Sequence, residues 1–436
     1  MSQYLWKRRA LPRAALSLLL ALLLQSATSF ASNDNLTLDE ALHTAHRQNH
    51  DLRLASIAIA SARAASVMAA AAPNPMLTLQ TMGINPHTGI GAGGLRDKTV
   101  DSTVRIDQLI ERGDKRALRT QNARQLESAA QHDLDDVQRQ LGIAVSQAYY
   151  DVLAALEKQV ITRQSAALYD ATVAAAQKRL KAGDLASADV ARLQIDALRA
   201  QNDVLQSSAE LNRTREVLVL LLGTRDDPAG LIPTDPWPAM PFDGSLSAQA
   251  TDALLARRAD VLAAQARLDA AVTAHKQALA LRTRDVSVGV QFEHYPISAT
   301  NTQGSGNTVG IALQIPLFAR YQYDGEIRMA DSLRDSAEEN LLRIRDLARS
   351  DLARARSDAQ AAFERIARYD NGLLAAARKS VDATEFAFSH GALGVMDVLD
   401  ARRTWRATQL DALAARADYA KSLAAWQAVT NERTAP

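Results

Sequence analysis

The sequence predicts a mainly α-helical protein with a small β part, arranged as two tandem structural repeats. Three observations lead to this prediction. Two very long stretches, 114–182 and 325–389, contain no proline and carry apolar residues at helical spacing. Four short segments alternate between apolar and polar residues, as strands with one buried face do. Similar motifs also recur in the same order at a nearly constant offset along the chain.

The amino terminus has the features of a secretory signal peptide at 1–31. Lys7, Arg8 and Arg9 precede an apolar run, and small and polar residues follow up to Ala31. The run is shorter than the roughly 20 residues that a membrane helix needs. No later run of apolar residues approaches that length, so the sequence predicts no transmembrane helix.

The composition excludes several classes of protein. The 436 residues include no cysteine, which excludes disulfides, thiolate metal sites and a lipid attached to an N-terminal cysteine. The chain has 50 Lys+Arg against 49 Asp+Glu, with both signs interspersed. This balance does not indicate binding to nucleic acid.

The first repeat is predicted at 32–227. Its elements are a helix at 37–72, strands at about 76–82 and 99–108, and a helical hairpin at about 114–222 made of helices 114–182 and 187–222. Thr37 and Glu40 form the pattern of a capping box, in which each side chain satisfies the other residue's backbone donor. Gly183 is suited to the left-handed turn that ends the long helix.

A proline-rich linker at 228–245 separates the first repeat from the second, which is predicted at 246–436. Its elements are a helix at 246–283, strands at about 285–293 and 307–316, and a helical hairpin at about 325–431 made of helices 325–389 and 395–431. The offsets are 317 − 109 = 208 for Leu109 and Leu317, 391 − 183 = 208 for Gly183 and Gly391, and 260 − 51 = 209 for Asp51 and Asp260.

Each of the four predicted strands has one apolar and one polar face. Alone, such a sheet would leave open edges, which lipid does not tolerate, and the smallest membrane barrels need about eight strands. Three copies would supply twelve strands, with apolar residues facing lipid and polar residues facing a lumen. The alternation by itself leaves open a small soluble sheet packed on helices.

The two longest predicted helices, 114–182 and 325–389, are too long for a compact domain of this size. At 1.5 Å per residue each would extend about 100 Å. Their narrow apolar stripes suit contacts between helices. Three copies, each with two helical hairpins, would supply twelve long helices, the same number as the strands, so a continuous tube is geometrically reasonable.

These features resemble the TolC-like outer-membrane factors, a family of outer membrane efflux proteins. The resemblance rests on both repeats, on Leu36-Thr37-Leu38-Asp39-Glu40-Ala41-Leu42, on Ile315-Pro316-Leu317-Phe318, and on Gly391 followed by Asp397-Val398-Leu399-Asp400-Ala401. Pro73-Asn74-Pro75 and the segment 108–116 look like the heavy-metal (cobalt-zinc-cadmium type) branch of the resistance-nodulation-division efflux systems. Arg112-Gly113-Asp114 departs from that branch, which usually has two glycines there.

The resemblance implies a trimeric 12-stranded β-barrel in the membrane, continued by a 12-helix α-barrel. It implies a passive exit duct in the outer membrane of a Gram-negative bacterium, extending into the periplasm. The implied partners are a second and third copy of the chain, a periplasmic membrane-fusion adaptor and an inner-membrane resistance-nodulation-division pump. Divalent heavy-metal cations lead as cargo; multidrug efflux and type I protein secretion remain alternatives. A periplasmic coiled-coil adaptor or scaffold is the alternative of another class.

The resemblance also implies a role for three acidic residues just beyond the helical tips. Acidic residues in the family line the closed periplasmic entrance, and the matching positions are Asp189, Asp397 and Asp400. Three copies would form a carboxylate constriction that gates passage and favours cations. A structural interpretation stays open, in which the helix dipole stabilises an Asp in the first turn and Ser187 is the N-cap. Asp400 lies about a turn too far along for that interpretation.

The tips of the family's helical hairpins also contact the adaptor. The candidates for this contact are the residues around the two tip glycines: Arg179, Leu180, Gly183, Ser187, Phe388 and Gly391. An alternative interpretation makes Arg179 a solvated charge and Leu180 a packing residue.

Three histidines, His43, His46 and His50, are spaced so that one helix face would present three imidazoles. No carboxylate or fourth ligand is within reach by sequence, which favours a solvated helix face over a metal site. No nucleophile, base and orienting residue form a catalytic set either. The sequence therefore predicts no enzyme, no cofactor and no resident metal.

Overall fold

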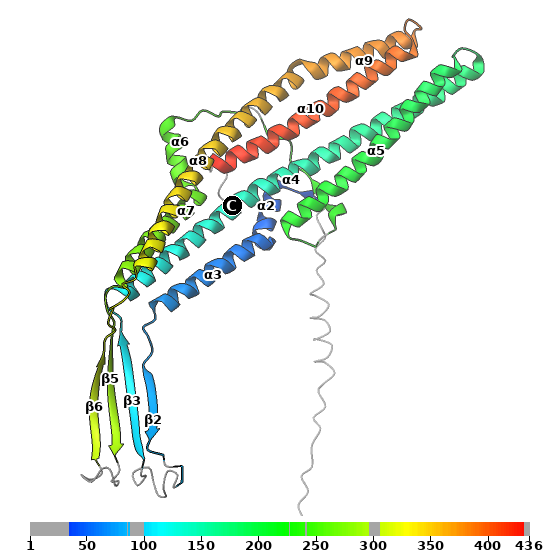
Figure 1. Ribbon diagram of the computed structural model, residues 1–436. Coiled ribbons are helices and arrows are strands. Elements are labelled where there is room, and N and C mark those ends of the chain that lie inside the picture. Colours follow the sequence, from blue (N-terminus) through cyan, green and yellow to red (C-terminus); the bar gives the residue numbers. More distant parts are fainter. Residues whose placement is uncertain are drawn as a thin grey trace, which may run out of the picture.

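The computed structural model describes residues 35–84, 86–87, 100–225, 227–239, 242–295 and 306–430. The signal peptide predicted at 1–31 lies outside the described residues. The molecule is elongated, with four long strands at one end and the tips of two helical hairpins at the other (Figure 1). Its long axis therefore separates a β end from a helical end.

The same order of elements occurs in both halves of the chain. The first half contains β1 Asn35–Leu36, α2 Leu38–Gln48, α3 His50–Ala70, β2 Met76–Met82, β3 Asp101–Ile110, α4 Lys115–Ala182 and α5 Ser187–Leu222. A 3₁₀ turn at Pro228–Gly230 and the short β4 Ile232–Pro233 lie between the halves. The second half contains α6 Ala248–Arg257, α7 Ala259–Ala280, β5 Val286–Tyr295, β6 Gly306–Gln314, α8 Asp324–Arg368, a π-helical turn Tyr369–Leu373, α9 Leu374–Ser389 and α10 Val395–Thr430.

The predicted capping box at the start of the first helix is confirmed. The Thr37 hydroxyl accepts the backbone N–H of Glu40 at 3.2 Å, and the Glu40 carboxylate accepts the Thr37 N–H at 2.9 Å. Just before this helix, β1 pairs in parallel with β4 of the linker. The fully buried Tyr149 hydroxyl donates to the Leu36 carbonyl at 3.0 Å and accepts the Asp235 N–H at 3.0 Å. Burial raises the pKa of Tyr149 to about 12, so the Tyr149 hydroxyl stays protonated and keeps its hydrogen bond to Leu36.

The helices predicted at 37–72 and 246–283 are each broken in two. Asn49 ends α2 and begins α3, and its side-chain oxygen caps α3 by accepting the Asp51 N–H at 2.8 Å. Arg258 ends α6 and begins α7 in the same way, without a side-chain cap. Neither position holds a proline or glycine, so the helical periodicity of the sequence predicted one continuous helix at each place.

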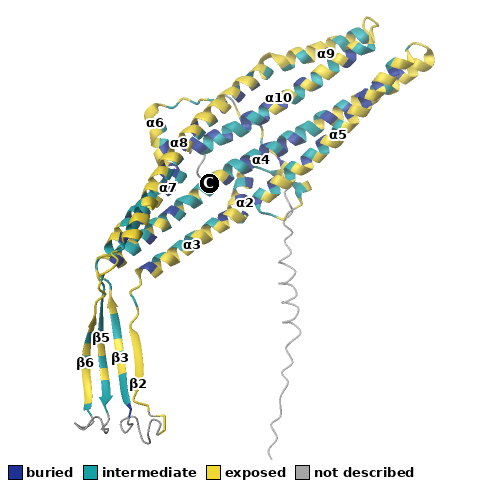
Figure 2. Ribbon diagram, viewed as in Figure 1, coloured by how far each residue is buried: buried dark blue, intermediate teal, exposed yellow. Residues whose placement is uncertain are grey.

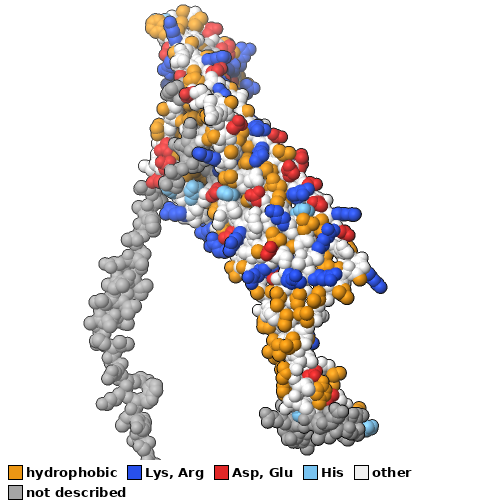
Figure 3. Space-filling model, turned by 90° about the vertical axis from the view of Figure 1, so that its left-hand side faces the viewer, with side chains coloured by type: hydrophobic (Ala, Val, Ile, Leu, Met, Phe, Trp, Pro, Cys, Tyr) orange, Lys and Arg blue, Asp and Glu red, His pale blue; other side chains and the backbone are white. Residues whose placement is uncertain are grey.

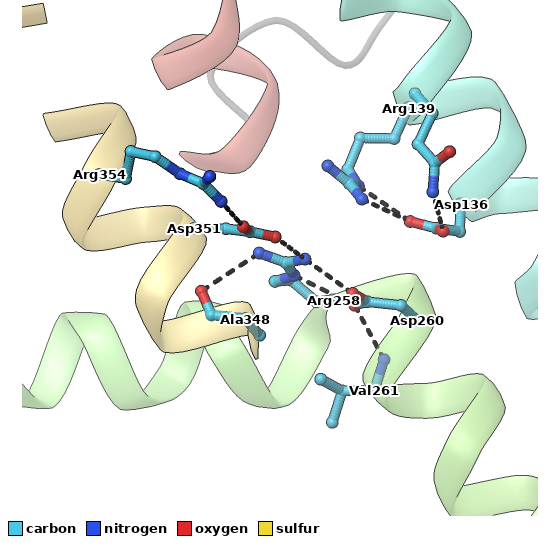
Figure 4. Close-up of polar contacts among 9 residues, drawn as sticks. Asp136, Arg139, Arg258, Asp260, Val261, Ala348, Asp351 and Arg354 are labelled. Atoms are coloured by element: carbon cyan, nitrogen blue, oxygen red, sulfur yellow. Dashed lines mark hydrogen bonds and ion pairs between the residues drawn. The ribbon is translucent and has the colours of Figure 1, made fainter. Parts of the chain in front are cut away.

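Arg258 is buried, and its charge is satisfied by neighbours on two other segments (Figure 4). Its guanidinium donates to both carboxylate oxygens of Asp260, at 3.1 and 2.7 Å, and to the Ala348 carbonyl at 3.3 Å. Asp351 of α8 lies 3.4 Å away. Burial alone would raise the pKa of Asp260, but the hydrogen bonds and the charge of Arg258 lower it. The cluster fixes the angle between α6 and α7 and joins both to α8.

The four long strands form one antiparallel sheet in the order β2-β3-β5-β6. The hairpins of the two halves meet at the β3–β5 pair, where Ile110 lies opposite Val286. β2 and β6 have no further strand beside them among the described residues. Most residues of the sheet are exposed or half-buried on both faces (Figure 2). The apolar face is therefore bare in a single chain.

The hydrophobic core lies along the helices. In the cluster that contains α4 and α5, Val145, Tyr149, Val152 and Leu218 are fully buried. α3 lies along α4 and carries large exposed side chains (Figure 1). By length and composition alone, α3 is the one described helix that could cross a membrane. The sequence prediction missed this property because it considered only unbroken apolar runs, and α3 reaches its hydropathy through many alanines.

The helix predicted at 325–389 is interrupted by the π-helical turn at Tyr369–Leu373. One extra residue in this turn rotates the faces of α9 relative to α8. Asp370 in the turn pairs with Arg416 of α10 at 2.9 Å, which holds the interrupted helix against its neighbour. The continuous α4 has 68 residues, so it extends about 100 Å.

Candidate functional site

Both helical hairpins end in tight turns at the same end of the molecule, opposite the strands (Figure 1). Gly183 has a φ of 85° and donates its N–H to the carbonyls of Arg179 and Leu180. Gly391 has a φ of 77° and donates to the Phe388 carbonyl at 3.0 Å. A Cβ at either glycine would meet nothing within 4 Å, so the left-handed backbone conformation alone explains both glycines.

Two of the predicted tip residues join the hairpins. The Arg179 guanidinium lies over the Phe388 ring, 5.6 Å from its centroid, which is a cation–π contact between α4 and α9. Leu180 is 36% exposed at the edge of the tip. Ser187 is the first residue of α5 and is exposed, and Ala186 is the N-cap. The proposed capping role of Ser187 is therefore wrong, because the chain enters the helix one residue earlier.

The three predicted gate carboxylates lie near the tips, and each has its own hydrogen-bond or ion-pair partner. Asp189 is half-buried in the first turn of α5, and its nearest cation is Arg192 at 3.9 Å. Asp397 is exposed in the first turn of α10 and accepts the Gly394 N–H at 3.0 Å. Within the described residues no hydrogen bond or ion pair joins the two sites. Asp397 therefore caps the amino-terminal end of its own helix, α10.

Asp400 lies one turn further along α10, and its side chain is 70% exposed. Arg403 is its cation, at 3.1 Å. This surface pair has little effect on stability, since solvent screens it. Asp400 is thus accessible to a passing ion or to another copy of the chain.

Sequence reasoning missed two ion pairs that connect the hairpins behind these carboxylates. Arg403 of α10 also bonds Asp196 of α5 at 2.5 Å, and Asp196 is only 6% exposed. One turn further from the tip, Arg406 bonds Asp203 at 2.8 Å. Burial alone would lower the pKa of Arg403, but its hydrogen bond and attraction to Asp196 raise it.

A repeat in the sequence indicates the acidic half of these pairs. The aspartates of α5 follow one another at intervals of seven residues: Asp189, Asp196 and Asp203. Residues seven apart lie on nearly the same face of a helix. The second and third of these aspartates pair with arginines of α10, and the sequence analysis considered only the first.

Arg402 connects three helices at the same level. It donates to Glu385 of α9 at 2.7 Å and to the Thr172 hydroxyl of α4 at 2.6 Å. Beside it lies a mostly apolar groove of about 290 Å³ between the two hairpins, lined also by Leu168 and Phe388. The tips therefore form one connected region with a groove between them.

The three histidines His43, His46 and His50 are all exposed. No group of three or more metal-ligating side chains occurs within the described parts of the chain. His43 and His46 belong to α2, whereas His50 begins α3 after the break at Asn49. The three imidazoles therefore do not share one helix face.

The sequence matches the outer membrane efflux protein family over residues 41–224 and again over 250–432. It is 26% identical over 383 residues to the cobalt-zinc-cadmium resistance protein CzcC of Cupriavidus metallidurans, covering 85% of this chain and 84% of that protein.

Solved structures show the same fold. A membrane protein from Pseudomonas aeruginosa has a TM-score of 0.76 at 20% identity, over 90% of this chain and 93% of that one. The open state of the MtrE outer membrane channel of Neisseria gonorrhoeae has a TM-score of 0.72 at 17% identity, over 90% and 88%. The chain therefore belongs to the outer membrane efflux protein family, whose place is the outer membrane of Gram-negative bacteria, extending into the periplasm.

Proposed function

We propose that three copies of the chain close a 12-stranded β-barrel in the outer membrane, continued by a 12-helix α-barrel in the periplasm. The observation that carries this proposal is the sheet, which within the described residues has two unpaired edges and a bare apolar face. Val309, Ile311 and Leu313 on β6 are 75%, 82% and 64% exposed. Lipid would cover that face, and neighbouring copies would pair with the edges.

Exposed apolar side chains on the helices support the same assembly. Leu198 and Leu205 lie seven residues apart on α5 and are 61% and 70% exposed. Val67 and Met68 of α3 are 69% and 76% exposed. Side chains at this spacing suit contact with another helix, and the single chain offers them none. A neighbouring copy would bury these side chains. Such burial would explain why α3 is so apolar although it lies in an aqueous compartment.

The tandem repeats proposed from the sequence fit this assembly. The two halves contribute equal numbers of strands and equivalent helical hairpins, so three copies approximate a sixfold tube. We place the first repeat at 32–227, the linker at 228–245 and the second repeat at 246–436, after a signal peptide at 1–31. The match of both halves to one family supports the division.

At the periplasmic entrance, the carboxylates of Asp189, Asp397 and Asp400 would form rings that slow anions and admit cations. The residues Arg179, Leu180, Gly183, Ser187, Phe388 and Gly391 would contact a membrane-fusion adaptor, which in turn meets an inner-membrane resistance-nodulation-division pump. The similarity to CzcC, a cobalt-zinc-cadmium resistance protein, favours divalent metal cations as cargo. Drugs or polypeptides are the other cargo classes, and family membership favours a duct over an adaptor or an enzyme.

Conductance of the purified protein in planar bilayers tests the gate. We expect Asp397→Ala with Asp400→Ala to raise the closed-state conductance and to reduce the preference for cations, because the entrance loses up to six charges in the trimer. Asp335→Ala, on an exposed carboxylate of α8 far from the tips, is the matched control. Unchanged conductance and selectivity in the double variant would remove the gate assignment.

A further inference from the structure

Two arginines lie next to each other where the sheet meets the helices. Ile110 and Val286 are the last paired residues of β3 and β5. Arg112 and Arg284 each lie two residues beyond that pair, and the hydrogen bond from the Arg112 N–H to Asp285 keeps the two segments together there, so a continued antiparallel register would set the arginines opposite one another. Both are exposed. By alternation they continue the apolar face of the sheet, on the side that would face lipid.

The carboxylates close to these two guanidinium groups are engaged elsewhere. Asp285 accepts the backbone N–H of Arg112 at 2.9 Å and pairs with the buried Lys115 at 2.8 Å. Lys115 also donates to the Thr283 carbonyl at 2.8 Å.

Two further acidic groups at this end of the helices are also paired. Asp324 pairs with Arg282 at 2.7 Å, and Glu111 pairs with Arg119 at 2.7 Å. Asp114 forms no ion pair in the described part of the chain, and neither does Arg112 or Arg284. Two like charges placed together without a counter-ion are unfavourable, so the arrangement is suited to an anionic ligand.

The surroundings match the boundary of a membrane. Lys and Arg side chains gather along the end of the helical part beside the strands, and the hydrophobic surface begins directly next to them (Figure 3). Arg284 lies 5.5 Å from the ring centroid of Phe318, and Phe318 packs edge-on against Tyr323 at 5.2 Å. Aromatic side chains concentrate at the level of lipid headgroups in membrane proteins.

We propose that Arg112 and Arg284 bind the phosphate of an anionic phospholipid in the periplasmic leaflet of the outer membrane. The proposal rests on the placement of the sheet in that membrane under the proposed function. A guanidinium pair can hold phosphate oxygens through several charged hydrogen bonds while the acyl chains lie along the apolar strands. Such a site would attach the protein to a specific class of lipid at the membrane boundary.

The test compares lipid retention by purified trimers in native mass spectrometry, using phosphatidylglycerol and phosphatidylcholine as probes. We expect the wild-type protein to retain phosphatidylglycerol preferentially, and Arg112→Gln with Arg284→Gln to reduce that retention roughly tenfold. Arg163→Gln with Arg213→Gln, two exposed arginines of the long helices, should retain it like the wild type.

Three further outcomes decide the proposal. Equal retention of both lipids by the wild-type protein would overturn it, and that measurement does not depend on any variant folding. Displacement of phosphatidylglycerol by millimolar inorganic phosphate would also overturn it, since a free anion would then be the ligand. Trimers of the double variant that resist heat and conduct normally, yet lose the lipid, would support the lipid site independently of the channel assignment.

Discussion

Asn49 and Arg258 have the same backbone conformation and the same structural role, 258 − 49 = 209 residues apart. Their φ angles are both −61°, and their ψ angles are 135° and 136°. Each residue ends one helix and begins the next. The two side chains stabilise the break between helices through different partners. Asn49 bonds the following N–H groups and the Leu221 carbonyl, whereas Arg258 bonds carboxylates and the Ala348 carbonyl.

Arg258→Met should destabilise the protein by about 3 kcal/mol, because it leaves Asp260 partly buried without its cation. The free energy of unfolding in urea measures the loss. Arg354→Ala is the matched control, since Arg354 bonds the same Asp351 but its side chain is 66% exposed. An equal, small effect of both variants would contradict the role assigned to the buried cluster.

The same cluster predicts a dependence of stability on pH. The pKa of Asp260 is lowered from 3.8 in the folded protein, so its contribution is present above that value and is lost as the pH falls through the depressed pKa. We expect wild-type stability to fall below about pH 4, and Asp260→Asn to lack that part of the fall. Parallel acid titrations of both proteins would contradict the assignment.

Gly289→Val should impair formation of the sheet. A Cβ at Gly289 would lie 2.3 Å from a carboxylate oxygen of Asp107, and that carboxylate accepts hydrogen bonds from the Arg105 guanidinium. We expect a loss of about 1–3 kcal/mol and fewer heat-resistant oligomers on gels. Gly306→Ala should have little effect, because a Cβ there meets nothing within 4 Å. Normal assembly of Gly289→Val would show that the Arg105–Asp107 pair is not required.

Arg403→Ala with Arg406→Ala should loosen α10 from α5. The buried Asp196 would lose its principal cation, at a cost of roughly 1–3 kcal/mol, and the tips would separate more readily. We expect a several-fold higher closed-state conductance in planar bilayers. Arg199→Ala is the control, because Arg199 is 74% exposed and lies 3.8 Å from the same Asp196. A conductance equal to the control's would mean that these pairs do not hold the entrance.

Periodicity was informative wherever one physical requirement dominates the sequence. The alternating strands and the long helices without proline follow directly from burial on one face. The breaks at Asn49 and Arg258 could not be predicted, because polar residues with good helical neighbours end these helices through tertiary contacts. The π-helical turn at Tyr369–Leu373 could not be predicted either, because one extra residue in a helix is visible only in the backbone hydrogen bonds.

The candidate site was predicted only in part. Arg179 and Phe388 were identified separately, and their contact follows from how α4 and α9 lie in space. The pairs Asp196–Arg403 and Asp203–Arg406 connect residues more than 200 positions apart, and only the heptad spacing of the aspartates hinted at them. Sequence spacing cannot show which arginine faces which carboxylate.

The number of copies in the detergent-solubilised protein tests the central claim most directly. Light scattering coupled to size-exclusion chromatography gives the protein mass of the complex independently of the detergent. We predict three chains of the processed protein in an outer-membrane fraction that requires detergent for extraction. A monomer that is soluble without detergent would contradict the account, because the bare apolar face and the open edges of the sheet would then need no partner.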